Sequence, residues 1–450
     1  MLARLAERKD SPAIFRLAAD ALEKHPAVGS RRIMKHRVGN LLRAGDDEVA
    51  ARLMFRFIEG SWRRGRDTAA TLRDLEMLDG RVSGVTAAEY AYWRAEALRH
   101  TGRLHDASQH AQNARQAFHA ASEPAKEAHA YRLLGHIESD LGAPATGREL
   151  VLEALDRFRN LADEAGFAQA QVVLGEIDYL LGEHARAREV LLEASSRCTR
   201  LGDALGHAQC CILLAMISTA VGGYQRSRDL LNQARSEFDA MGYRLGLAQC
   251  DVVLGHADHR AFEMDRARVR ALAARASFRE LVNPRGEAAC ERLLAMIAID
   301  TDDYDAALAH AEVASKIYAR LHDPWGDLET RLLFAQVALA RGDERARDLV
   351  ESCDEIAIQE AEPRQHRHLT RAWLAREEGR WRDAAGEIEK ARTAYGEKAR
   401  SGDHTPQLLA RFAQLEWAPE ARERLDAWVA IQKSENLEGP SSAEWPMRPG

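Results

Sequence analysis

Residues 164–202 read EAGFAQAQVVLGEIDYLLGEHARAREVLLEASSRCTRLG and contain the clearest local pattern of the chain. Apolar residues recur at mostly helical spacing from 166 to 180, and Gly182 follows where a helix would end. A second helical pattern runs from 184 to 200, and Gly202-Asp203 interrupts it, with Asp203 as a possible N-cap for the next helix. The stretch therefore predicts two helices of similar length joined by a tight turn.

The same pattern returns every 40 residues along most of the chain. Small residues at one register position let helix axes approach closely, namely Ala95, Gly135, Gly175, Ala215, Gly255, Ala295 and Ala335. Large apolar residues two positions earlier fill the space between hairpins, namely Trp93, Leu133, Val173, Leu213, Val253, Leu293 and Leu333. Glycines mark a further position, at Gly166, Gly206, Gly246, Gly286 and Gly326. The ladders predict a stack of helical hairpins, with further helix starts at Asn283-Pro284 and Asp323-Pro324.

The hairpin unit resembles the tetratricopeptide repeat (TPR). The residues that carry the resemblance in one unit are Leu174-Gly175, Gly182, Ala187 and Ala194, and in the next Leu214-Ala215, Gly222, Tyr224, Leu231 and Ala234. The period of 40 departs from the usual one of about 34, as in long-period arrays of bacterial signalling ATPases and transcriptional regulators. HEAT repeats share the longer period, but they lack the Gly/Ala ladders that flank a turn glycine, so they are the less favoured alternative.

This resemblance implies an all-α fold, a right-handed superhelical solenoid of TPR-like hairpins. We expect N-terminal capping helices over residues 1–45, about nine hairpins over 46–400 and C-terminal capping helices over 401–433. The tail 434–450, rich in Pro, Gly and Ser, is expected to be disordered. The array is expected to form one continuous body without internal domains.

Composition and motifs exclude several functions. The net charge of −7 argues against a protein that coats nucleic acid, and no run of 18 apolar residues predicts a membrane span. Residues 1–10 lack the apolar core of a signal peptide, so we expect a cytoplasmic protein. Phosphate-binding loops, nucleophile elbows and zinc-binding His-Glu-x-x-His helices are missing from the sequence. We therefore predict a non-enzymatic protein that needs no cofactor and no metal.

Three local features have a functional and a structural interpretation. Cys210, Cys250 and Cys290 share one register, where about 10 Å between equivalent residues makes them buried fillers rather than a metal site. His256 and His259 have metal-ligand spacing, but no third ligand is evident. A basic cluster at 31–37 could contact nucleic acid, or could be a solvated helical face balanced by the acidic residues 46–48. The structural interpretation is favoured in each case.

By the resemblance, one stripe of each first helix faces a concave groove. Gln169, Gln209 and Gln249 form a ladder on this stripe, and amide side chains can grip the backbone of an extended peptide without reading its sequence. Apolar neighbours would seat partner side chains, although part of this apolar stripe could instead be buried between the helices. The candidate partner-binding residues are Arg132, His136, Gln169, Val172, Glu176, Tyr179, Gln209, Ile212, Met216, Gln249, Val252, His256, His259 and Arg260.

Two functions follow from this interpretation. The first is a scaffold or sensor that binds a protein or peptide partner in the groove. The alternative is an accessory or inhibitory subunit of a larger effector, such as a signalling ATPase, a protease or a transcription regulator. In that case the outer face or the capping helices would hold the partner.

Overall fold

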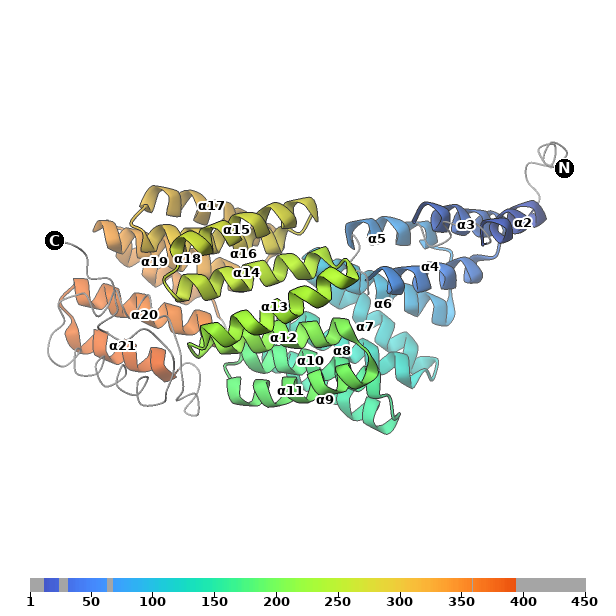
Figure 1. Cartoon of the computed structure of the whole chain (residues 1–450), viewed down its shortest axis with the longest axis horizontal. Coiled ribbons are helices and arrows are strands. Elements are labelled where there is room, and N and C mark those ends of the chain that lie inside the picture. The colour runs from blue at the N-terminus through green and yellow to red at the C-terminus, as the bar shows by residue number, and fades with distance from the viewer. Residues whose placement is uncertain (1–11, 24–30, 63–67, 358, 394–450) are drawn as a thin grey trace. The chain divides into compact units, whose positions relative to one another are not determined.

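The computed structural model describes residues 12–23, 31–62, 68–357 and 359–393. Every regular element within these ranges is a helix, which confirms the predicted all-α class (Figure 1). The capping helices predicted for 401–433 and the tail 434–450 lie outside the described residues. Within the described ranges, no helix combines the length and the apolar character that crossing a bilayer requires.

The chain divides into two compact units, residues 1–134 with 241–243, and residues 135–240 with 244–450. The division falls inside α8 (Pro124–Asp140), whereas the expected end of the capping helices near residue 45 stays a prediction. The helices of the first unit bury an apolar cluster that includes Met34, Val38, Met54 and Ile58. The helices of the first unit that precede α8 are α2 (Pro12–Glu23), α3 (Arg31–Ala44), α4 (Asp47–Trp62), α5 (Thr68–Leu75), the short 3-10 helix η1 (Glu76–Leu78), α6 (Gly84–His100) and α7 (Leu104–Ala120).

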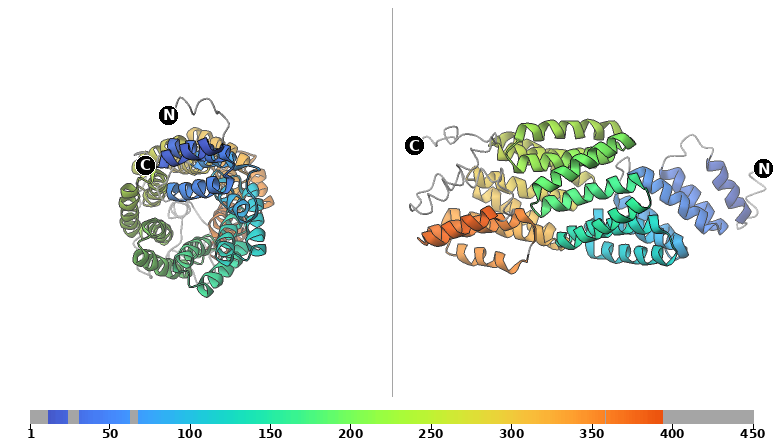
Figure 2. Two further views of the ribbon diagram at one scale, coloured as in Figure 1. Left: turned by 90° about the vertical axis from the view of Figure 1, so that its right-hand side faces the viewer. Right: turned by 90° about the horizontal axis from the view of Figure 1, so that it is seen from below.

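The second unit is a series of hairpins that follow one another in chain order (Figure 2). Each hairpin pairs a first helix with a second helix, and the first helices of successive hairpins also touch. The first helices are α10 (Glu164–Leu180), α12 (Ala204–Ala220), α14 (Arg244–Arg260), α16 (Pro284–Asp300), α18 (Pro324–Arg341) and α20 (Ala361–Glu377). The second helices are α9 (Pro144–Asn160), α11 (His184–Leu201), α13 (Tyr224–Met241), α15 (Met264–Glu280), α17 (Tyr304–Leu321), the short α19 (Ala346–Ser352) with η2 (Cys353–Glu355), and α21 (Trp381–Thr393).

The 40-residue repeat arises from a turn that recurs every 20 residues. One residue adopts the left-handed conformation at every twentieth position from 102 to 342. Gly182, predicted to follow a helix end, is one of them, with φ of 81°. Some of these positions hold a residue with a side chain, such as Val282 with φ of 53°. Both helices of a hairpin therefore have almost the same length, 17 or 18 residues from α6 to α18.

The predicted N-caps are confirmed. Asp203 accepts a hydrogen bond from the Gly206 amide at 3.1 Å, and Asn283 does the same for Gly286 at 2.8 Å. Asp323 accepts from Gly326 at 3.0 Å. Each cap satisfies an amide that the helix itself leaves without an acceptor.

Four of the five ladder glycines are explained by the ring of an aromatic residue from the preceding helix, and at Gly206 the Cys198 sulfur takes the place of the ring. A Cβ atom added to Gly286 would lie 2.4 Å from the Phe278 ring, and one added to Gly246 would lie 2.7 Å from the Phe238 ring. The same contact joins Gly326 to Tyr318. Each ring therefore packs directly on a glycine backbone, and this contact sets how closely one hairpin follows the last.

We predict that Gly286→Ala destabilises the protein, because the new methyl group would overlap the buried Phe278 ring. Overpacking of this kind costs about 1–3 kcal/mol. Gly386→Ala on α21 is the matched control, since a Cβ there meets nothing within 4 Å. That variant should be neutral or more stable by up to about 1 kcal/mol. Thermal unfolding followed by circular dichroism measures both, and equal melting temperatures for the two variants would contradict the ring contact.

Candidate functional site

The candidate site is the set of predicted partner-binding residues on the first helices, here called the first-helix stripe. Thirteen of its fourteen members, His136 to Arg260, lie in the second unit. Arg132 belongs to the first unit, where it donates hydrogen bonds to the Tyr92 hydroxyl at 3.0 Å and to Glu96 at 3.2 Å. The stripe separates into a glutamine ladder, an apolar part and a charged part, which differ in exposure.

The glutamine ladder reaches solvent. Gln209 and Gln249 are exposed and Gln169 is half-buried. Within the described residues, none of the three amide groups makes a hydrogen bond to the protein. Other glutamines find partners: Gln171 donates to Glu193 at 3.0 Å, and Gln336 donates to the Thr370 hydroxyl at 3.2 Å. The ladder therefore presents unused donors and acceptors at one register of three successive first helices.

The apolar part of the stripe is mostly buried. Val172 is 6% exposed and Ile212 is 8% exposed, so the structural interpretation holds for both. Val172 packs in a cluster with Leu191 and Leu213, against which Tyr179 and Met216 lie half-buried. Val252 is also half-buried. The apolar surface available to a partner is therefore smaller than the sequence suggests.

The charged members of the stripe are held by partners on other helices. His136 lies 3.1 Å from Glu176, so two predicted residues on α8 and α10 contact each other. His259 lies 2.7 Å from Asp300, and Arg260 lies 2.7 Å from Glu362. Within the described residues, no group of three potential ligands surrounds either predicted histidine. Both histidines contact residues of α16, His259 through Asp300 and His256 through Arg292.

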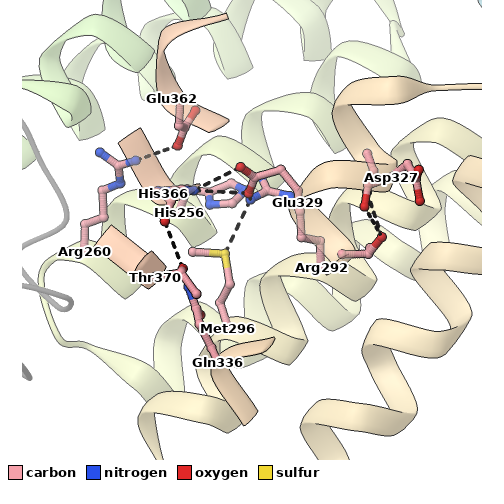
Figure 3. Close-up of polar contacts among 12 residues, drawn as sticks. His256, Arg260, Arg292, Met296, Asp327, Glu329, Gln336, Glu362, His366 and Thr370 are labelled. Atoms are coloured by element: carbon pink, nitrogen blue, oxygen red, sulfur yellow. Dashed lines mark hydrogen bonds and ion pairs between the residues drawn. The ribbon is translucent and has the colours of Figure 1, made fainter. Parts of the chain in front are cut away.

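A buried polar cluster continues the stripe beyond Arg260. Arg292 on α16 contacts Glu329 on α18 at 3.1 Å, and Glu329 contacts His366 on α20 at 3.0 Å (Figure 3). The Arg292 guanidinium also lies 3.5 Å from His256 and stacks over the Trp325 ring at 4.7 Å. The cluster therefore links the inner sides of α14, α16, α18 and α20.

Sequence reasoning missed Glu329, Glu362 and His366. A signal for Glu329 was present, because it occupies the register of Gln169, Gln209 and Gln249 two repeats later. A carboxylate in that register next to an arginine in the register of Val172 indicates an ion pair between α16 and α18. Nothing in the sequence spacing marks Glu362, because α20 follows the short α19 and leaves the 40-residue register.

The cluster is electrostatically balanced. Burial would raise the pKa of Glu329, but His366, Arg292 and Arg260 outweigh it and lower that pKa, so the carboxylate stays ionised. Burial, with the Arg292 and Arg260 cations, holds the pKa of His256 well below its ordinary value. His256 is therefore neutral at pH 7, and the charges enclosed around it are paired.

Several contacts join hairpins of the second unit that are far apart in the sequence. Arg285 lies 2.8 Å from Asp140 and 3.0 Å from Asp323. The Ala145 amide donates to Gln359 at 3.2 Å, across 214 residues of sequence. Arg260 and Glu362 are 102 residues apart. The hairpins of this unit thus curl until the end of α8 meets the starts of α16, α18 and α20.

The basic cluster of the first unit is partly neutralised within the protein. Arg31 lies 2.6 Å and Lys35 lies 3.2 Å from Asp74, whose side chain is 1% exposed. This pairing favours the structural interpretation of the cluster over a nucleic-acid site.

No family model matches this chain, and no curated protein matches it either. Solved structures do. A Rap protein complexed with Competence and Sporulation Factor aligns with a TM-score of 0.55 and 12% identity, over 77% of this chain and 93% of that one. The fold is that of TPR-like repeat proteins. The Rap conjugation gene regulator of the plasmid pLS20, in complex with the Phr* peptide, aligns with a TM-score of 0.54 and 11% identity, over 77% of this chain and 95% of that one. At these identities the likeness concerns the fold alone.

We predict that Glu329→Gln lowers the free energy of unfolding by about 3 kcal/mol, because it leaves the enclosed Arg292 cation without its carboxylate. The pKa of Glu329 is lowered in the folded protein. The ionised Glu329 side chain therefore makes its full contribution to the free energy of unfolding above the pKa of about 4 that it has in the unfolded chain. That contribution is lost as the pH falls through the lower folded value, and the difference between variant and wild type should then shrink.

Urea unfolding at several pH values measures this difference. Asp305→Asn is the control, because it breaks the Arg341–Asp305 ion pair. That pair also has a short N–O distance, 2.6 Å, but its carboxylate is 92% exposed. Exposed pairs contribute about 0–1 kcal/mol. Equal effects of the two variants would show that Glu329 does not neutralise a buried cation.

Proposed function

We propose that this protein is a non-enzymatic scaffold that binds an extended segment of a protein or peptide partner along the first-helix stripe. The observation that carries the proposal is the ladder of Gln169, Gln209 and Gln249, whose amide groups are unused within the described residues and exposed in two of three repeats. An unused amide on one repeat is unremarkable, but three in one register on adjacent helices form a regular row of donors and acceptors.

The spacing of the row suits an extended backbone. Packed helices lie about 8–10 Å apart, and an extended chain advances about 3.4 Å per residue. Consecutive glutamines would thus meet about every third residue of the peptide. Half-buried Tyr179, Met216 and Val252 would contact side chains between these points, and the flexible Met216 would tolerate different ones. Affinity would come from backbone pairing, with limited selection of sequence.

Two further observations support a binding role over a catalytic one. The titratable side chains of the stripe contact polar partners on other helices, as His136 contacts Glu176 and Arg260 contacts Glu362. The cysteines at 210, 250 and 290 are buried, and burial raises the pKa of Cys250 and Cys290 to about 12. Such thiols are poor nucleophiles, and six free cysteines fit a reducing compartment such as the cytoplasm. The two Rap structures are complexes with a factor and a peptide, and the shared fold supports binding of a peptide here.

We expect Gln209→Ala combined with Gln249→Ala to weaken peptide binding about tenfold, because each amide forms hydrogen bonds of about 0.5–1.5 kcal/mol with the peptide backbone. Peptides selected from a random ten-residue library on the wild-type protein are the probes, and fluorescence polarisation measures their affinity. Gln225→Ala on α13 is the matched control, since Gln225 is an exposed glutamine that is already bonded to Asp229 at 3.0 Å.

The double variant removes only exposed amide groups, so its melting temperature should equal that of wild type. A peptide with an ester in place of one backbone amide should bind wild type more weakly than the all-amide peptide does. On the double variant, the same replacement should change the affinity little. Unchanged affinity of the double variant for every selected peptide would overturn the proposal.

A second candidate function, binding through the outer face, is favoured by one observation. Leu152 and Leu192 share a register on the neighbouring second helices α9 and α11, and Leu272 has it on α15, beyond Asn232 of α13; the three leucines are 39%, 46% and 40% exposed. Aligned apolar side chains at the surface mark possible protein contacts. An accessory or regulatory subunit could hold a larger effector there.

We expect Leu192→Glu to abolish capture of such an effector, because the variant places a charge in an apolar contact. Ser196→Glu is the control: it adds the same charge one turn further along the exposed face of α11 without removing an apolar group. Quantitative pull-down from native lysate compares the two variants. Equal recovery of all captured proteins by Leu192→Glu and wild type would show that no effector binds through this register of the outer face.

A further inference from the structure

The turn between α10 and α11 places one glutamate between two arginines. The Glu183 carboxylate lies 2.9 Å from the Arg148 guanidinium on α9 and 3.5 Å from the Arg186 guanidinium on α11. The same two guanidiniums lie 3.4 Å and 3.2 Å from Asp178, whose side chain is buried. The Glu183 carboxylate therefore bridges the two arginines at the surface, above a buried second acid.

The turn between α14 and α15, two repeats later, has the same arrangement. The Glu263 carboxylate lies 2.8 Å from the Arg228 guanidinium on α13 and also contacts the Arg266 guanidinium on α15. Asp258, at the register of Asp178, is again the buried acid and lies 2.9 Å from Arg228. In both turns a glutamate thus bridges an arginine of the preceding second helix and an arginine of the following one.

The turn from α12 to α13, between these two, keeps both arginines and lacks both acids. Arg188 on α11 and Arg226 on α13 occupy the two arginine registers, 40 residues from their counterparts on either side. Ser218 stands at the register of the buried aspartates, and Gly223 stands at that of the bridging glutamates. Both arginines are exposed, and within the described residues neither contacts a carboxylate. This turn therefore repeats the cations of its neighbours without their anions.

The backbone of this turn is the same as that of its two neighbours. The amides of Glu183, Gly223 and Glu263 each donate to the carbonyl five residues earlier, at 2.8 Å in all three turns. The residue before each is left-handed, as at Gly182 with φ of 81° and Gly222 with φ of 78°. A constant backbone at a constant register gives the two arginine positions of this turn the same separation as in the other two. Both guanidiniums can therefore reach one carboxylate.

The side chains of the turn itself cannot neutralise the two guanidiniums. Gly223 has no side chain, and the nearest atoms to a Cβ added there belong to Ser218, at 3.3 Å or more. The Ser218 hydroxyl is buried and donates to the Leu214 carbonyl at 2.8 Å. The bridging glutamates of the neighbouring turns are 43% and 33% exposed, so their position is open to solvent. A group from outside the protein can thus take the equivalent position between the two guanidiniums.

Charge and chemistry identify this group. Both neighbouring turns use a carboxylate at this position, and guanidiniums bind carboxylates through charge-assisted hydrogen bonds. The protein as a whole has a net charge of −7, which repels acidic molecules. An acid that binds must therefore meet cations that the protein leaves locally uncompensated.

We propose that Arg188 and Arg226 bind the carboxylate of an acidic side chain from a protein partner. This carboxylate occupies the place that Glu183 and Glu263 hold in the neighbouring turns. The site goes beyond the proposed function, because it uses neither the glutamine ladder nor any other member of the first-helix stripe.

A carboxylate supplied by the chain itself tests the geometry. Gly223→Glu should melt about 1 °C higher than Gly223→Gln, because only the glutamate completes the arrangement of the neighbouring turns. Gly223 is outside the left-handed region, so the backbone accepts both side chains. The difference should be lost when both variants also carry R188Q/R226Q. Equal melting temperatures of G223E and G223Q in the presence of both arginines would overturn the site.

A defined acidic peptide tests the ligand. The probe is a fluorescein-labelled ten-residue peptide of alternating Glu and Gly, and the reference peptide has Gln in place of Glu. Wild type should bind the Glu peptide about tenfold more tightly than the Gln peptide, measured by fluorescence polarisation. R188Q/R226Q should lose this preference. Gly223→Glu should lose it as well, because its own carboxylate occupies the site, whereas Gly223→Gln should keep it.

Arg268→Gln is the matched control for the loss of a cation. Arg268 on α15 has the register of Arg188, but Ala306 stands where the second arginine would be. Its removal should leave the preference for the Glu peptide unchanged. Circular dichroism and melting temperature establish that each variant is folded before its binding is compared.

The peptide pair also separates this site from the proposed function. Gln209→Ala/Gln249→Ala should change the affinity for both peptides alike, because the two peptides have the same backbone, and should leave their ratio unchanged. A wild-type protein without preference for the Glu peptide, or a preference that R188Q/R226Q retains, would overturn the carboxylate site alone. The proposed function is judged independently, on the peptides selected from the random library.

Discussion

The close contact of a side chain with a glycine backbone, made by an aromatic ring at four of five glycines and by Cys198 at Gly206, is the constraint on which the repeat depends. The ring comes from the last turns of one second helix, and the glycine is the third residue of the next first helix, as in Phe278 and Gly286. No side chain fits between them, so the distance between successive hairpins is fixed within narrow limits. Equal helix lengths and a left-handed turn every 20 residues then keep the register constant from hairpin to hairpin.

A constant register has a direct consequence for chemistry. Residues 40 apart in sequence become neighbours on adjacent helices, so any residue type that recurs at one position forms a continuous row. The rows serve different purposes along the same stripe. Gln209 and Gln249 expose unused amides, whereas Glu329, in the same register, closes a buried pair with Arg292. The stripe therefore changes from an exposed polar surface to an enclosed charged cluster without any change of fold.

The enclosed cluster shows how a helical repeat protein accommodates charge in its interior. Isolated charges would be costly to bury, and here each cation contacts a carboxylate from a different helix. Arg285 joins α8 to α16 and α18, and Arg260 joins α14 to α20. Such pairs favour one curvature of the hairpin stack, because other curvatures would separate the paired side chains. The same pairs place a group of titratable side chains beside the row that we propose as the peptide site.

The helices, their turns and their caps could be predicted from the sequence, because they depend on residues within about four positions of one another. Gly182, Asp203 and Asn283 were identified on that basis, and the period of 40 gave the hairpin stack and the stripe on its first helices. Which stripe residues are accessible to a partner follows only from the packing of the hairpins on one another. Val172 and Ile212 are buried by neighbouring hairpins, and Arg260 meets Glu362 across 102 residues. These outcomes depend on the curvature accumulated over several hairpins, and small rotations per repeat leave no trace in the spacing of residues.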